Sequence, residues 1–103
     1  MKSMEEMLAA AQQAAATIQQ QMSDAQAKLD AIEVEGVAGG GLVRVTATAK
    51  GRIRRVSIDE SLLNASEKQM VEDLVAAAFN DARTKADAVS NTEMSKMTQG
   101  LPL

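Results

Sequence analysis

Apolar residues recur along the first third of the chain at alternating steps of four and three residues. They are Met4, Leu8, Ala11, Ala15, Ile18, Met22, Ala25, Leu29 and Ile32. This alternation is the spacing of a coiled-coil seam, in which one stripe of a helix faces a partner helix. Because neither Gly nor Pro interrupts the stripe, we predict a helix from about Ser3 to about Asp30, roughly 40 Å long at about 1.5 Å per residue. A domain this small cannot cover the seam alone, so we expect a second helix, of this chain or of another copy, to pack on it.

Beyond that helix the hydrophobic period becomes that of β-strands. Residues 32–35 alternate apolar and charged, which is typical of a short half-buried strand. The glycine-rich residues 36–41 predict a turn and not a phosphate-binding loop, because Lys, Ser or Thr and a helix do not follow them. Residues 42–49 and 52–58 then predict a hairpin around the loop Lys50-Gly51.

The two-residue loop sets a register that mostly places apolar side chains opposite apolar ones, which supports the hairpin. One side of the hairpin pairs Val43 with Ile58, Val45 with Val56 and Ala47 with Arg54. The other side pairs Arg44 with Ser57, Thr46 with Arg55 and Thr48 with Ile53.

A second helix is predicted after a turn over residues 59–65. Residues 66–69 have the sequence of a capping box that starts it. Its buried face has helical spacing and comprises Val71, Leu74, Val75, Ala78, Phe79, Ala82, Ala86 and Val89. The pattern weakens over residues 90–92, where the helix either frays or continues to Met97, and residues 99–103 form a flexible tail.

The predicted order is a long N-terminal helix, a three-stranded antiparallel β-meander and a long C-terminal helix. This is an α+β arrangement with the helices on one face of a small sheet. At 103 residues the chain is one domain, over residues 1–98, followed by the tail. With Phe79 as the only aromatic residue, close helix packing and a partner chain must supply burial that rings usually give. We therefore expect a homodimer, with an interface that includes Leu8, Ile18, Met22, Leu29 and Phe79.

The composition argues against an enzyme. The chain has no His, the commonest general acid–base at neutral pH, and no Cys for a disulfide or thiolate site. Neighbouring acids such as Glu72 and Asp73 do not face each other on a helix, and a metal site of carboxylates alone would be weak. We expect no catalytic residue, metal, cofactor or small-molecule substrate. No apolar stretch approaches the length of a signal peptide or membrane span, so we expect a cytoplasmic protein without membrane contact.

Positive charge is concentrated in one segment of an otherwise acidic chain. Residues 36–58 hold five basic side chains and no acidic one, although the formal net charge is −3. The five are Arg44, Lys50, Arg52, Arg54 and Arg55. Guanidinium groups donate paired hydrogen bonds to phosphate oxygens, which makes these residues candidate contacts for a polyanion. The alternative is that they protect an edge strand from aggregation, with Glu33 or Glu35 neutralising Arg44.

The segments 41–63 and 72–83 resemble the YbaB/EbfC nucleoid-associated proteins of bacteria. They read GLVRVTATAKGRIRRVSIDESLL and EDLVAAAFNDAR, and the resemblance extends over nearly the whole chain. It implies a small homodimer in the nucleoid that binds double-stranded DNA with little sequence preference, its helices acting like tweezers. On that basis Lys2, Arg83 and Lys85 on the helices become candidate DNA contacts. Two features depart from the family: Lys-Gly replaces the usual Asn-Gly in the hairpin, and the Pro-rich ending is reduced to residues 100–103.

Two functions therefore remain open from the sequence. The first is DNA binding through backbone and shape, since no aromatic residues interleave the basic ones for base stacking and no recognition helix is evident. The second is a dimeric protein-interaction adaptor, whose helical seam docks a partner helix while DNA association is indirect or absent. Binding of purified protein to DNA at low salt discriminates between them.

Overall fold

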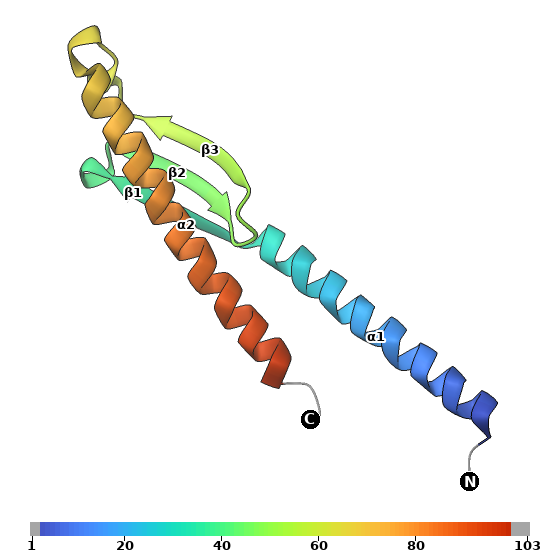
Figure 1. Cartoon of the computed structure of the whole chain (residues 1–103). Coiled ribbons are helices and arrows are strands. Elements are labelled where there is room, and N and C mark those ends of the chain that lie inside the picture. The colour runs from blue at the N-terminus through green and yellow to red at the C-terminus, as the bar shows by residue number, and fades with distance from the viewer. Residues whose placement is uncertain (1–2, 100–103) are drawn as a thin grey trace.

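The computed structural model describes residues 3–99, and its elements follow the predicted order (Figure 1). They are α1 (Met4–Ala31), β1 (Glu33–Ala38), β2 (Val43–Thr48), β3 (Ile53–Ile58) and α2 (Lys68–Gln99). Short 3₁₀ turns at Gly39–Gly41, Glu60–Leu62 and Ala65–Glu67 join them. The three strands pair antiparallel in the order β1-β2-β3, so the α+β prediction is confirmed.

α1 begins one residue after the predicted start. The Ser3 hydroxyl accepts a hydrogen bond from the backbone N–H of Glu6 at 3.1 Å, which makes Ser3 the N-cap. The helix then projects from the hairpin end of the sheet (Figure 1). Within α1 only Leu29 is buried. The large seam residues farther from the sheet stay in solvent: Met4, Leu8, Ile18 and Met22 are 78%, 59%, 49% and 48% exposed.

The core lies between the sheet and α2. Its buried members are Val43, Val45, Ala47, Leu62, Ala78 and Ala82. The predicted buried face of the second helix is confirmed, since all its residues are buried or half-buried and those from Val71 to Ala82 lie in this core. The prediction that both helices lie on one face of the sheet is wrong for α1, because it projects beyond the hairpin end of the sheet (Figure 1) and buries only Leu29. Only α2 lies across the sheet (Figure 1).

α2 covers β1 and β2 but leaves β3 open. The buried residues of the sheet face belong to β2 and, at Gly36, to β1. Ile53 and Val56 on β3, by contrast, are 42% and 41% exposed on that same side. An apolar strip at the edge of the sheet is therefore uncovered in the single chain.

β1 is longer than predicted, because Gly36 belongs to the strand and not to the connection after it. Gly36 is buried where α2 crosses β1, and only a residue without a side chain fits that crossing. The connection is limited to Gly39–Gly41, whose φ angles of +62°, +68° and +96° suit glycine.

α2 starts differently from the prediction, whereas its end agrees with the longer of the two predicted alternatives. The Ser66 hydroxyl donates to the Asn64 side chain, so the expected capping box does not form, and a 3₁₀ turn leads into the helix at Lys68. The helix then continues through residues 90–92 to Gln99. The predicted tail beyond Gln99 lies outside the described residues, as does Lys2.

Candidate nucleic-acid interface

The tip of the β2–β3 hairpin is a three-residue loop, Ala49-Lys50-Gly51. Thr48 and Arg52 close it, since the Thr48 N–H donates to the Arg52 carbonyl at 2.8 Å and the Gly51 N–H donates to the Thr48 carbonyl at 2.9 Å. The φ of +101° at Gly51 completes the type of turn that three-residue hairpins prefer. The predicted two-residue loop is therefore wrong by one residue, and Lys50 stands in the middle of the exposed tip.

The extra loop residue is offset by a β-bulge at Arg54. The predicted pairs are confirmed from Val43 with Ile58 to Thr46 with Arg55. Ala47, however, pairs with Ile53 and not with Arg54, which leaves Arg54 unpaired in the ladder. Its side chain reaches the face of the sheet opposite α2.

Arg52 and Arg54 are held by acidic groups at the junction of α1 and β1. Arg54 Nη2 donates to the carbonyl of Asp30 at 2.9 Å, and its Nε lies 3.6 Å from Glu33 Oε2. Arg52 Nε lies 3.6 Å from Asp30 Oδ1, an ion pair too long for a hydrogen bond. These two arginines link the hairpin to the end of α1, while their side chains stay 66% and 43% exposed.

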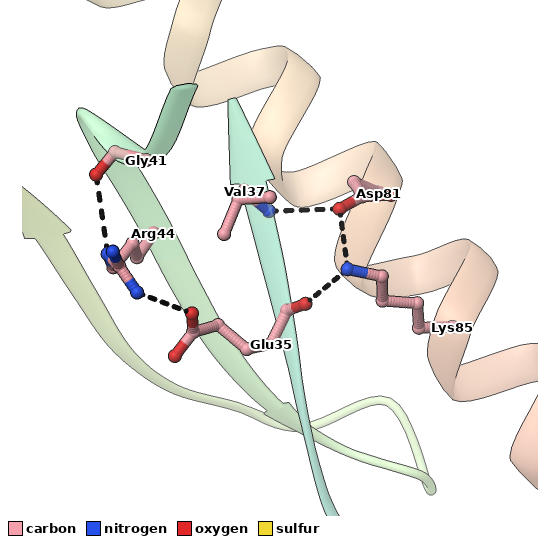
Figure 2. A network of polar contacts seen from close by, with 6 residues as sticks. All are labelled: Glu35, Val37, Gly41, Arg44, Asp81 and Lys85. Atoms are coloured by element: carbon pink, nitrogen blue, oxygen red, sulfur yellow. Dashed lines mark hydrogen bonds and ion pairs between the residues drawn. The ribbon is translucent and has the colours of Figure 1, made fainter. Parts of the chain in front are cut away.

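Arg44 is neutralised within the sheet (Figure 2). Its Nη1 donates to Glu35 Oε1 at 2.9 Å, and its Nε donates to the Gly41 carbonyl at 3.3 Å. Pairing with Glu35, one of the two partners weighed from the sequence, is thus confirmed. Through Gly41, Arg44 stabilises the turn that joins β1 and β2.

Lys85 on α2 connects this helix to β1 through polar contacts (Figure 2). Its Nζ donates to the Glu35 carbonyl at 2.7 Å and lies 3.0 Å from Asp81 Oδ2. Asp81 Oδ2 also accepts the Val37 backbone N–H at 2.9 Å. That backbone hydrogen bond, followed by the one from Lys85, lowers the pKa of the Asp81 carboxyl. Lys85 therefore has a fixed anionic partner at neutral pH.

Three basic side chains within residues 3–99 have no ion pair: Lys50, Arg55 and Arg83. Arg55 lies opposite Thr46, on the sheet face turned away from α2. Lys50 and Arg83 line one hollow of about 450 Å³ between the hairpin tip and α2. We call it the tip hollow. It brings together two residues that the sequence separates by 33 positions.

The remaining walls of the tip hollow are part polar and part apolar. Asn80 and Asp87 add an amide and a carboxylate from α2, and Ile53 and Phe79 are among the apolar residues that line it. Sequence reasoning missed Asn80 and Asp87. Their spacing around Arg83, by three and four residues, indicates one helical face, but nothing in the sequence places that face beside the hairpin.

The YbaB/EbfC DNA-binding family matches residues 1–101, which is essentially the whole chain. The chain belongs to the YbaB/EbfC DNA-binding family. Its fold is also similar to the crystal structure of the uncharacterized protein HP0035 from Helicobacter pylori, with a TM-score of 0.74 and 18% sequence identity. That similarity covers 95% of this chain and 99% of the other.

Membership in the YbaB/EbfC family identifies DNA as the ligand class of this chain, since the family is a DNA-binding, nucleoid-associated one. Between residues 3 and 99 no three His, Cys, Asp or Glu side chains gather in a way that could hold a metal ion. Over the same residues, no helix is both long and apolar enough to cross a membrane.

Proposed function

We propose that this YbaB/EbfC chain binds duplex DNA in the nucleoid as a homodimer, through phosphate contacts and with little preference for base sequence. The family supplies the ligand class. The observation that supports the mode of binding is the set of unpaired cations Lys50, Arg55 and Arg83, which all lie at the surface. Cations on a surface without stacking aromatic side chains suit phosphate oxygens better than base edges.

The exposed seam of α1 supports the homodimer. Leu8, Ile18 and Met22 were expected in the interface, and their exposures of 59%, 49% and 48% leave them available to a partner. Leu29 is different, since at 3% exposure it already packs within its own chain. Phe79 is half-buried beside the open face of β3. A second copy would cover apolar surface that one chain leaves in water.

The test is a fluorescence anisotropy titration of labelled duplexes at several salt concentrations. If the three unpaired cations of each protomer all contact phosphates, the affinity falls roughly a thousandfold between about 50 and 200 mM salt. Two duplexes of unrelated sequence should give dissociation constants within about threefold, because phosphate contacts carry no sequence information. Absence of binding at 50 mM salt would contradict the proposal and favour the adaptor function. A large difference between the duplexes would contradict only the low specificity.

A further inference from the structure

The face of the sheet turned away from α2 is polar, in contrast to the apolar face that α2 covers. We call it the polar sheet face. The strand register places alternate residues of each strand on it. All of them except Val37 are polar or charged: Glu33, Glu35, Val37, Arg44, Thr46, Thr48, Arg55 and Ser57. The bulged Arg54 adds a further guanidinium, since its Nε lies beside Glu33 of the same face.

The charge of the polar sheet face changes from acidic to basic across the strands. β1 contributes the two carboxylates of Glu33 and Glu35, whereas the arginines come from β2 and β3. Arg44 and Arg54 each lie beside one of these carboxylates, at 2.9 and 3.6 Å. Arg55 is the one of the three unpaired cations that lies on this face. A polyanion is therefore attracted to the β2–β3 half of the face and repelled by β1.

The paired arginines keep hydrogen-bond donors that their own chain does not engage. A guanidinium group carries more N–H donors than one carboxylate can accept. Arg44 Nη2 and Arg54 Nη1 have no partner within residues 3–99, and the two side chains are 54% and 43% exposed. The hydroxyls of Thr46 and Ser57 lie opposite Arg55 and Arg44 in the register. Guanidinium and hydroxyl groups together suit phosphate oxygens.

We propose that the backbone of bound DNA lies against the β2–β3 half of the polar sheet face, with Arg55 as the principal phosphate contact. This surface rests on the proposed function and makes it specific, because it names the face of the sheet that meets the DNA. It is compatible with the homodimer, since the open apolar strip of Ile53 and Val56 lies on the opposite face of the sheet. A partner chain on that strip leaves the polar sheet face accessible.

The first comparison is between two variants that each lose one positive charge. Arg55→Ala removes the unpaired cation of the polar sheet face. Lys68→Ala removes an exposed lysine at the start of α2, which pairs with Glu72. Each phosphate contact contributes about 0.9 to the slope of log K against log salt. Arg55→Ala should therefore lose about 0.9 of slope for each Arg55 that contacts DNA, while Lys68→Ala and the charge-conserving Arg55→Lys keep the wild-type slope.

The second comparison is between two variants that each lose one negative charge from an exposed ion pair. Glu33 is 51% exposed and lies 3.6 Å from Arg54 Nε, and Glu72 is 54% exposed and lies 3.2 Å from Lys68 Nζ. Glu33→Gln frees the charge of Arg54 and removes a repelling carboxylate, so duplex binding at about 50 mM salt should tighten by about threefold. Glu72→Gln should leave the affinity unchanged. Weaker or unchanged binding by Glu33→Gln would contradict the proposed surface.

The outcomes separate this inference from the function on which it rests. If the wild type binds DNA and Arg55→Ala keeps its full salt slope, the proposed surface is wrong and the DNA-binding function stands. The same conclusion follows if Arg55→Ala and Lys68→Ala lose slope equally, because net charge then explains the effect. If the wild type binds no duplex at all, both proposals are overturned. Circular dichroism and sedimentation should match those of the wild type for every variant, which shows that fold and assembly are retained.

Discussion

Gly36 is the residue on which the packing of α2 depends most directly. A Cβ atom at this position would lie 2.2 Å from the Ala78 carbonyl oxygen and 2.3 Å from the Ala82 nitrogen. Both are backbone atoms of α2, so no side-chain rotation can relieve the overlap. Ala78 and Ala82 are themselves fully buried and small. The helix backbone therefore approaches β1 closely because all three contacting residues lack bulk.

We predict that Gly36→Ala lowers the free energy of unfolding by about 3 kcal/mol or more, because α2 must move away from the sheet. Gly40→Ala is the control: its new Cβ has no atom within 4 Å, and only the positive φ of +68° opposes it. That control should cost about 1–2 kcal/mol. Urea denaturation at one protein concentration measures both. Equal effects of the two variants would contradict the close approach.

The basic residues show how far sequence reasoning reaches at the scale of single side chains. It identified the charged segment correctly, because charge can be counted. It could not separate Arg52 and Arg54, which pair with Asp30 and Glu33, from Lys50, which has no such partner within residues 3–99. That difference depends on where the end of α1 lies relative to the hairpin, a tertiary fact without a local signal.

At the scale of elements, the hairpin shows which features the sequence predicts and which it does not. Hydrophobic alternation predicted both strands and the register from Val43 to Thr46, since a slip by one residue would expose the apolar face. The loop was predicted one residue too short. The bulge at Arg54 restores the register, so two compensating changes left no trace in the hydrophobic pattern. Turn geometry and bulges of this kind require backbone information that the pattern lacks.

The heptad stripe of α1 is the sequence pattern that the single chain explains least. It predicted a partner helix, and in the single chain most of the stripe faces solvent. The contact of α1 with α2 includes an ion pair in the half nearer the sheet, where Lys28 Nζ lies 2.8 Å from Glu93 Oε2. The first helical turns of α1, from Met4 to Leu8, are exposed. A stripe of this regularity without an intramolecular partner favours an intermolecular one.

We predict that Ile18→Glu/Met22→Glu makes the protein monomeric at micromolar concentration, since two carboxylates in the seam of each helix disfavour its burial. Gln13→Glu/Ala16→Glu adds the same charge on the opposite side of α1 and should leave the assembly intact. Sedimentation velocity distinguishes the two. A wild-type monomer, or a dimer that tolerates both pairs of changes, would contradict a role of the seam in self-association.

The whole molecule is far more elongated than a compact domain. Residues 3–99 extend over 77 × 19 × 17 Å with a radius of gyration of 21.2 Å. A compact chain of this length has about 13 Å. The difference arises because α1 points away from the sheet and buries almost nothing. The shape was not predictable in detail, although the length of the seam already indicated that one small domain could not cover it.

At the scale of the molecule, a basic segment lies within a chain whose net charge is negative. Five basic residues lie between acidic flanks, and the total is −3. The long-range field of the protein therefore opposes approach to DNA, and the local cations act only at short distance, within about one Debye length of roughly 10 Å at 0.1 M salt. Affinity in this arrangement depends on the ionisation of the flanking carboxylates as well as on the cations.

Because the chain has no His and no Cys, no side chain with an ordinary pKa near neutrality can change this balance. We predict that the dissociation constant for duplex DNA, at fixed ionic strength, changes by less than about twofold between about pH 6 and 7. Below about pH 5 it should tighten as flanking carboxylates are protonated. Anisotropy titrations across this range measure the effect, and a tenfold change between pH 6 and 7 would contradict a charge balance set by carboxylates, lysines and arginines alone.

Folding stability should move in the opposite direction at acidic pH. The Val37 backbone hydrogen bond lowers the pKa of Asp81 from 3.8, and the Lys28 hydrogen bond lowers the pKa of Glu93 from 4.5. A carboxyl with a lowered folded-state pKa stabilises the fold above its unfolded value and loses that contribution as pH falls through the folded value. The melting temperature should therefore be level near neutrality and fall below about pH 4.5. Tighter DNA binding near pH 5 thus precedes the loss of the fold, and melting curves recorded at each pH separate the two effects.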